Sequence, residues 1–215
     1  MSGSENLSGR PAVLLEACVE SLEEALAAEG RGAHRLELCA RLDLGGITPA
    51  DTLVRDILQG VNIPVKVMVR PRGGDFLYSD EEFLEMEQSV SRLLKMGVHG
   101  LVLGITGIHG FLDLERIARL AALAAPLPVC VHKAIDAAPD PVAEVKRLCT
   151  IPGLTSVLSS GGAATALEGA GVLKRMVEAA DQRLVIIAAG RITPENLDAV
   201  VRASGVAECH GRKIV

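Results

Sequence analysis

The chain has 215 residues with a formal net charge of -5, and its 49% hydrophobic and 23% charged residues are the balance of an ordinary globular protein. The lack of a basic tract argues against a nucleic-acid partner, and no apolar run approaches the roughly 20 residues of a membrane-spanning helix. With only 2% aromatic residues, the core must be built from Leu, Val, Ile and Ala. Five cysteines, an odd number without a signal peptide, favour reduced thiols in a cytoplasmic protein.

Residues 1–11 contain Ser, Gly and Asn and little that could be buried, which predicts a disordered leader or a cloning remnant. Residues 12–215 are expected to form one domain, in which apolar runs alternate with amphipathic stretches in the manner of βα units. Strands are expected at Val13–Cys18, Arg35–Cys39, Val65–Arg70, Gly100–Gly104, Pro128–His132, Ser156–Ser159, Leu184–Ala188 and Val206–Cys209. Helices are expected to begin near Ser21, Pro49, Ser79, Leu112, Pro141, Ala164 and Pro194.

Eight parallel strands with right-handed helical crossovers can close on themselves, so we predict a short α/β fold of the TIM-type (β/α)8 barrel class. A doubly wound sheet usually has fewer strands and a dominant glycine-rich first turn, which this chain lacks. After Cys209 only six residues remain, so the final helix is expected to be missing or very short. A second subunit or the leader is then expected to cover the apolar seam between the last and first strands.

The first two strands end in the same Glu-x-Cys pattern, formed by Glu16, Cys18, Glu37 and Cys39. Because side chains alternate along a strand, each glutamate should share the inward face with the cysteine of its own strand. Neighbouring strands lie about 4.8 Å apart, which would let two thiolates hold one soft ion such as Cu(I). Cysteine is also a common core filler, whereas a buried carboxylate favours a functional or polar-network role.

The third strand leads into Arg70-Pro71-Arg72-Gly73-Gly74-Asp75, a turn rich in charge and glycine. We expect Arg70 and Arg72 to face the same mouth of the barrel, where two guanidinium groups beside glycine amides would bind an anion. The alternative is a salt-bridged lattice in which Asp75 and the two strand glutamates neutralise these arginines.

The fifth strand places His132 at the mouth, where it could act as acid, base or ligand, or be tied to Asp136 or a backbone carbonyl. The sixth and seventh strands end in small residues with free amides, among them Ser160, Gly161 and Gly190. Such loops bind phosphate or carboxylate in many barrels, and they also occur wherever a strand turns tightly into a helix. On the eighth strand, Glu208 and His210 should share a face, so the mouth could hold His132 and His210 together.

Taken in order, these motifs resemble the CutC-type copper homeostasis family. They are Leu-Glu-x-Cys-Val-x-Ser at 15–21, Arg-Leu-Glu-Leu-Cys-Ala at 35–40, Gly-Gly-Ile-Thr-Pro at 45–49, Val-Arg-Pro-Arg-Gly-Gly-Asp-Phe-Leu-Tyr-Ser-Asp at 69–80, Val-His-Lys-Ala-Ile-Asp at 131–136, Leu-Ser-Ser-Gly at 158–161, Ala-Gly-Arg-Ile at 189–192 and Glu-Cys-His at 208–210. The resemblance implies a short TIM-type barrel, a cytoplasmic location, dimers or higher homo-oligomers, and Cu(I) handling by Cys18 and Cys39. Lys133 and Ile135 stand where Arg and Phe are expected, and Arg191 where Gly is usual.

Two functions follow from these residues. The first is a copper homeostasis protein that binds Cu(I) through Cys18 and Cys39 as a cytosolic buffer or carrier, without redox turnover. The alternative is an enzyme acting on a small phosphate- or carboxylate-bearing molecule. In that enzyme Glu16, Glu37, Asp75 and His132 would transfer protons, and Arg70, Arg72, Ser160, Gly161 and Gly190 would hold the anion. A weaker third interpretation is a scaffold barrel that acts through its uncovered seam.

Overall fold

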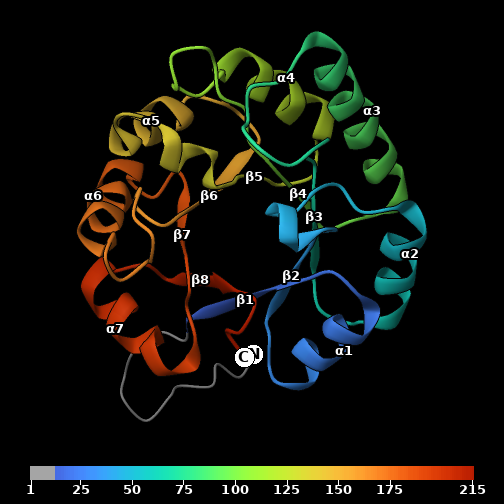
Figure 1. Ribbon diagram of the computed structural model, residues 1–215, viewed down its shortest axis with the longest axis horizontal. Helices are drawn as coiled ribbons and strands as arrows, with labels where there is room; N and C mark the ends of the chain where they lie inside the picture. The colour runs from blue at the N-terminus through green and yellow to red at the C-terminus, as the bar shows by residue number, and fades with distance from the viewer. Residues whose placement is uncertain (1–12) are drawn as a thin grey trace.

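The computed structural model describes residues 13–215, in which eight parallel strands form a closed barrel. The strands pair in chain order and β8 returns to β1, so the predicted TIM-type barrel is confirmed. Figure 1 shows the strands at the centre with the helices arranged around them. The strands are β1 (Leu14–Val19), β2 (Arg35–Leu38), β3 (Val65–Met68), β4 (Gly100–Leu103), β5 (Val129–Val131), β6 (Leu154–Ser159), β7 (Val185–Ala189) and β8 (Glu208–Gly211).

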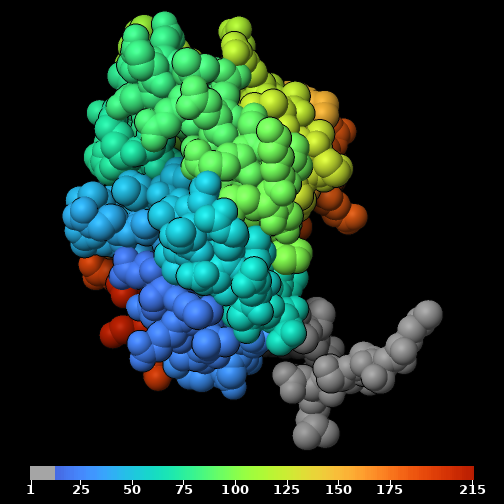
Figure 2. Space-filling model, turned by 90° about the vertical axis from the view of Figure 1, so that its right-hand side faces the viewer, coloured from blue at the N-terminus to red at the C-terminus, as the bar shows by residue number. Residues whose placement is uncertain are grey.

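Seven α-helices lie among the described residues and follow the first seven strands. They are α1 (Leu22–Gly30), α2 (Asp51–Gly60), α3 (Asp80–Met96), α4 (Leu114–Ala124), α5 (Pro141–Leu148), α6 (Ala170–Ala180) and α7 (Pro194–Ser204). Short 3-10 helices, η1 (Leu42–Leu44) and η2 (Lys133–Ala137), lie in the loops after β2 and β5. Figure 2 shows α1, α2 and α3, from blue to green, forming the outer wall on one side. No helix of residues 13–215 is long and apolar enough to cross a membrane.

Most helices begin where the sequence predicts, because their caps are encoded locally. Ser79 accepts a hydrogen bond from the amide of Glu82, whose carboxylate accepts one from the Ser79 amide. Helix α6 is the exception, since it begins at Ala170 rather than near Ala164. Thr165 and Glu168 instead cap each other in a separate turn between β6 and α6.

The inward and outward faces of the strands form two different cores. Outward side chains such as Leu36, Leu38 and Leu101 pack beneath the helices in one large apolar cluster. The inward cluster contains Cys18, Cys39, Met68, Val102, Cys130, Leu158, Ile187 and Ala189. Gly104, directly after β4, leaves space for a larger polar side chain, because a Cβ on it would lie 2.5 Å from the His132 ring. The inward glycine therefore fixes where His132 can sit.

The last strand begins and ends two residues later in the chain than predicted. It spans Glu208–Gly211 rather than Val206–Cys209, because the ladder with β1 begins where Leu14 faces Glu208. The described chain after β8 contains no further helix, as expected. Ile214 is nevertheless buried, and Arg31 donates a hydrogen bond to the carbonyl of Val215.

Candidate functional site

A cavity of about 340 Å³ opens among the loops that follow the strands, where barrel proteins carry their functional residues. Its inner part is lined by Cys18, Glu37, Cys39 and His210. Apolar side chains of Leu42, Met68, Phe76, Leu158 and Ala189 form much of its wall. Its outer part carries Arg70, His132, Lys133, Gly190, Arg191 and Arg212. Thiol, carboxylate, imidazole and guanidinium groups therefore share one space.

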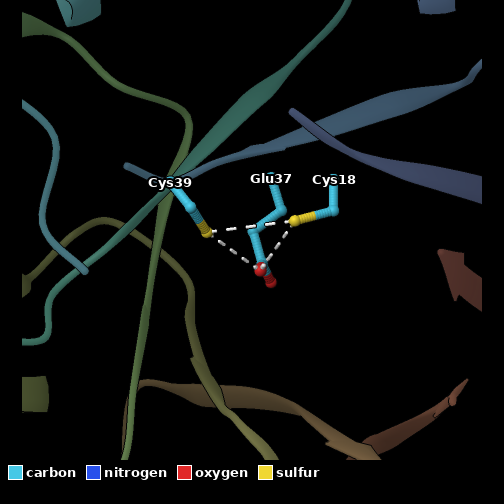
Figure 3. A group of neighbouring side chains, drawn as sticks. All are labelled: Cys18, Glu37 and Cys39. Carbon is cyan, nitrogen blue, oxygen red and sulfur yellow. Dashed lines mark hydrogen bonds between the residues drawn. The ribbon is translucent and has the colours of Figure 1, made fainter. Parts of the chain in front are cut away.

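Two thiols and one carboxylate meet at the inner end of this cavity. Cys18 lies opposite Glu37 in the register of β1 and β2, and Cys39 follows directly after β2. The Sγ atoms of Cys18 and Cys39 are 4.0 Å apart. The Glu37 Oε1 atom lies 3.9 Å from the first sulfur and 3.5 Å from the second (Figure 3). Glu37 Oε2 is buried and has no hydrogen-bond partner among the described residues.

Beside the thiols, Glu16 anchors a network of buried charges that extends over four adjacent strands. Its carboxylate pairs with Arg35, lies 3.4 Å from the Nζ atom of Lys66, and lies 3.0 Å from Nδ1 of His210. Arg35 also reaches Glu208 at 2.6 Å. A fully buried carboxylate is costly in isolation, so these partners explain how Glu16 can lie inside the barrel.

The buried charges shift the pKa values of Glu16, Cys18 and Glu37 in different directions. Burial opposes ionisation of Glu16, yet the hydrogen bond from His210 and the charge of Lys66 hold its pKa well below the ordinary value. The hydrogen bond with Cys39 lowers the pKa of Cys18 to about 5 despite burial, with a further contribution from His210. Burial raises the pKa of Glu37 to about 7, against the attraction of His210. The pocket thus contains one readily ionised thiol and one readily protonated carboxylate.

The two cysteines of this pair behave differently from each other and from the remaining thiols. The same shared hydrogen bond that favours the Cys18 thiolate raises the pKa of Cys39 well above the ordinary value, and burial adds to the effect. Burial raises the pKa of Cys130 to about 11 and that of Cys209 to about 12. Cys18 is therefore the thiol best prepared to act as a nucleophile or metal ligand at neutral pH.

His132 lies where the sequence predicts, at the end of β5 and against the cavity. Its Nδ1 accepts a hydrogen bond from the amide of Ala134 at 3.1 Å, rather than pairing with Asp136. Burial, reinforced by the charge of Arg70, lowers the pKa of His132 to about 3, so the ring is neutral. The proton then resides on Nε2, which has no partner among the described residues.

The structure separates the two arginines that were expected to face one mouth. Arg70 lines the cavity, but its terminal nitrogens donate to the carbonyls of Leu44, Gly46 and Gly74. Arg72 instead lies outside the cavity lining, where it pairs with Glu82 and with Asp75 at 3.0 Å. Arg72 lies four residues beyond the end of β3, and the chain bends from Pro71 onward, so the alternation of the strand no longer applies to it.

The loop after β6 is filled by a carboxylate of the protein itself. Asp136 accepts hydrogen bonds from the hydroxyls of Ser159 and Ser160 and from the amides of Ser160 and Gly162. Ser160 and Gly161 therefore lie around Asp136 and do not line the cavity. Gly190, after β7, does line it.

Sequence reasoning omitted two residues that complete the inner site, Arg35 and Lys66, and it placed His210 at the mouth without pairing it with Glu16. Strand alternation could have found Arg35 and Lys66. Arg35 lies two positions before Glu37, and Lys66 lies four before Arg70, on the same inward faces. Their ion pairing with Glu16 depends on strand neighbours far apart in the chain and could not be read from one strand.

Fold and site together define a TIM-type barrel protein with a thiol-containing, strongly polar cavity at the C-terminal ends of its strands. The chain matches the CutC family model over residues 13–215, and it belongs to the CutC family.

Individual relatives agree with this assignment. The copper homeostasis protein cutC homolog of Homo sapiens is 45% identical over 198 residues, covering 92% of this chain and 72% of the relative. A CutC family protein of Mesorhizobium japonicum is 41% identical over 197 residues, covering 92% and 76%. A crystal structure assigned to CutC, from Streptococcus agalactiae, is 32% identical with a TM-score of 0.88, covering 94% of this chain and 100% of the other.

Proposed function

We propose that this CutC family protein binds Cu(I) between Cys18 and Cys39 and serves as a copper buffer or carrier. The observation that carries the proposal is the 4.0 Å separation of the two sulfurs at the inner end of an open cavity. Metal–thiolate bonds of about 2.3 Å place two sulfurs on one ion no more than about 4.6 Å apart, so this pair fits without backbone movement. Thiolates are also the ligands that select a soft monovalent ion.

The surroundings of the pair support binding of a cation as cargo. Glu37 faces both sulfurs, and its second oxygen is unpartnered within the described chain. A carboxylate is a hard ligand that suits Cu(I) poorly, so we assign Glu37 to charge balance beside the ion rather than to its first coordination sphere. Nε2 of His210 lies 3.9 Å from Oε1 of Glu37, so an imidazole lies beside the carboxylate.

The test is a competition titration of Cu(I) against a soft chelator. The C18S/C39S double variant should lose tight binding by tenfold or more, while C149S, which alters a thiol outside the barrel lumen, should bind as the parent does. Circular dichroism of each variant checks that the fold is intact. Equal affinity in C18S/C39S and the parent would refute the proposal.

A second candidate function is an enzyme, and the observation that favours it is the contact of Glu16 with His210 in a cavity that His210 and Cys18 both line. Glu16 holds Nδ1 of His210 at 3.0 Å, and the imidazole in turn stabilises the Cys18 thiolate. A carboxylate that orients a histidine beside a thiol is an arrangement used for nucleophilic catalysis. Under this alternative, H210N would abolish turnover of the substrate and leave Cu(I) affinity nearly unchanged, whereas the copper proposal requires no turnover.

Location and assembly complete the proposal. The five thiols are free in the structure, which supports a reducing, cytoplasmic environment. Three large apolar side chains are exposed on two loops: Leu77, Ile108 and Phe111. The two loops are joined by a hydrogen bond from the Thr106 amide to the Phe76 carbonyl. Exposed apolar residues at one rim support self-association into a homodimer or higher oligomer, which light scattering would measure directly.

A further inference from the structure

The outer part of the cavity contains two buried N–H donors without an acceptor. Nε2 of His132 carries the ring proton, because Nδ1 accepts the Ala134 amide. Nε of Arg70 is also unpartnered among the described residues, although the terminal nitrogens of that guanidinium are held by carbonyls. Both residues are only 4% exposed and both line the cavity. Buried donors without partners are uncommon in folded proteins, and here they point to an acceptor supplied by a ligand.

The charges around these donors favour an anion. Arg191 lines the cavity and has no acidic group within 4.0 Å in the described chain. Lys133 is attracted to Asp136 at 3.6 Å, a distance that leaves its ammonium free to donate elsewhere. Arg212 is already paired with Glu20 and Glu24 at 2.9 Å each. The opposing charge is Glu37, which lies at the inner end with the thiols.

Backbone conformation adds to this picture at the end of β7. Gly190 has φ of +115°, which side-chain-bearing residues rarely adopt, and a Cβ there would make a tight contact of 3.1 Å with the amide nitrogen of Ala166, so the position favours glycine. Arg191 follows with φ of +55°, a left-handed conformation that non-glycine residues rarely adopt. The strained turn carries the Arg191 side chain to the cavity, at a position where phosphate-binding barrels commonly bind their ligand.

We propose that the outer half of the cavity binds the oxyanion group of a small organic molecule, received by His132 and Arg70 and attracted by Lys133 and Arg191. The apolar wall between this subsite and the thiols, including Met68 and Leu158, accommodates the body of the molecule. The cavity volume of about 340 Å³ limits the ligand to a small metabolite. This subsite goes beyond Cu(I) binding and does not depend on it.

Calorimetric titration of the full chain with inorganic phosphate and, separately, with succinate tests the subsite and distinguishes a phosphate from a carboxylate ligand. At least one probe should bind, and K133Q/R191Q should weaken that binding tenfold or more. K146Q/K174Q removes the same net charge from exposed positions on α5 and α6 and should bind as the parent does. If neither probe binds the parent, or if both double variants weaken binding equally, the subsite is wrong.

Alkylation of Cys18 supplies a readout inside the same cavity. Iodoacetate and iodoacetamide react alike, with the sulfur forming an S–C bond as iodide leaves with the C–I electron pair, but only iodoacetate carries a negative charge. The ratio of iodoacetate to iodoacetamide rates at Cys18 should fall at least threefold in K133Q/R191Q, with the ratio at Cys149 unchanged. The C18S/C39S variant should retain phosphate or succinate binding, so failure of the copper proposal and failure of this one give different results.

Discussion

The two halves of the barrel lumen are built from opposite kinds of residue. Strands β8, β1, β2 and β3 form a charged half, which contributes Glu16, Arg35, Lys66 and His210. Strands β4 to β7 form an apolar half, whose inward residues include Val102, Cys130, Leu158 and Ile187. Buried charges are tolerated where an opposite charge lies within reach on the adjoining strand or the next one, so these charges gather on four neighbouring strands. The apolar half excludes water from the lumen, and the resulting low dielectric strengthens the interactions between these charges.

The contrast predicts that equally buried polar groups have unequal consequences for stability. Glu16 lies in the charged half and holds three cationic partners, whereas Ser156 lies in the apolar half with no partner for its hydroxyl in the described chain. Loss of the Glu16 carboxylate leaves buried cationic groups without their partner. Loss of the Ser156 hydroxyl leaves no other group unpaired.

The largest effect is expected from Glu16→Gln in the charged half. Neutralising this carboxylate leaves Lys66 without its ion-pair partner and Arg35 with Glu208 alone, which should reduce the free energy of unfolding by about 3 kcal/mol. Urea denaturation followed by circular dichroism measures the loss. Glu115→Gln, on the exposed face of α4, is the matched control and should change stability by less than about 0.5 kcal/mol. A loss below about 1 kcal/mol for Glu16→Gln would contradict the proposed dependence on the charged half.

Next in size is Asp136→Asn, which tests a carboxylate at the rim of the apolar half. Asp136 accepts several hydrogen bonds from the β6 loop, and an amide can satisfy fewer of these donors. Hydrogen bonds to a charged group each contribute about 1.5 to 3 kcal/mol, so we expect a loss of about 2 to 3 kcal/mol. Hydrogen exchange should also increase at the Ser160 and Gly162 amides. Unchanged exchange there would show that Asp136 does not hold the loop.

The repeated alternation of apolar runs with amphipathic stretches was enough to predict the barrel, and period-two alternation within the strands was enough to predict the inward placement of Glu16, Cys18 and Glu37. The same rule failed for Arg72, since the chain turns after Arg70 and alternation no longer applies. Alternation along the sequence therefore predicts which side chains point inward only within the strand and not in the loop that follows it.

The loops after β6 and β7 show a second limit. Both offer small residues and amides in the sequence, yet Asp136 fills the first from a distant position while the second lines the open cavity. The pairing of Glu16 with His210 likewise joins β1 to β8 across nearly the whole chain. Such contacts depend on barrel closure, which a single sequence does not encode locally.

A smaller effect is expected from the pH dependence of His132 at the rim of the apolar half. Burial lowers the folded-state pKa of His132 to about 3, below the unfolded value near 6.5, so protonation favours unfolding. The stability that neutral His132 supplies is complete above pH 6.5 and is lost as pH falls from there toward 3, by up to about 1.4 kcal/mol per pH unit. Between pH 7 and pH 5 the parent should lose about 1 to 2 kcal/mol more than H132N does in urea titrations. Parallel pH profiles for the two proteins would count against a neutral buried ring.

The smallest effect is expected from Ser156→Ala, the counterpart of Glu16→Gln in the apolar half. Ser156 is 4% exposed on the inward face of β6, and its Oγ has no hydrogen-bond partner among residues 13–215. Removing an unsatisfied hydroxyl relieves its desolvation cost and leaves no donor or acceptor unpaired, so stability should stay within about 0.5 kcal/mol or rise slightly. The same urea titration measures the change in stability, with Ser204→Ala as the control. The Ser204 hydroxyl donates to the Val200 carbonyl at 2.7 Å, so removing that hydroxyl should destabilise the protein more than Ser156→Ala does. If Ser156→Ala instead destabilised the protein by 2 kcal/mol or more, the apolar half would contain a polar network of its own, and the division of the lumen into charged and apolar halves would no longer hold.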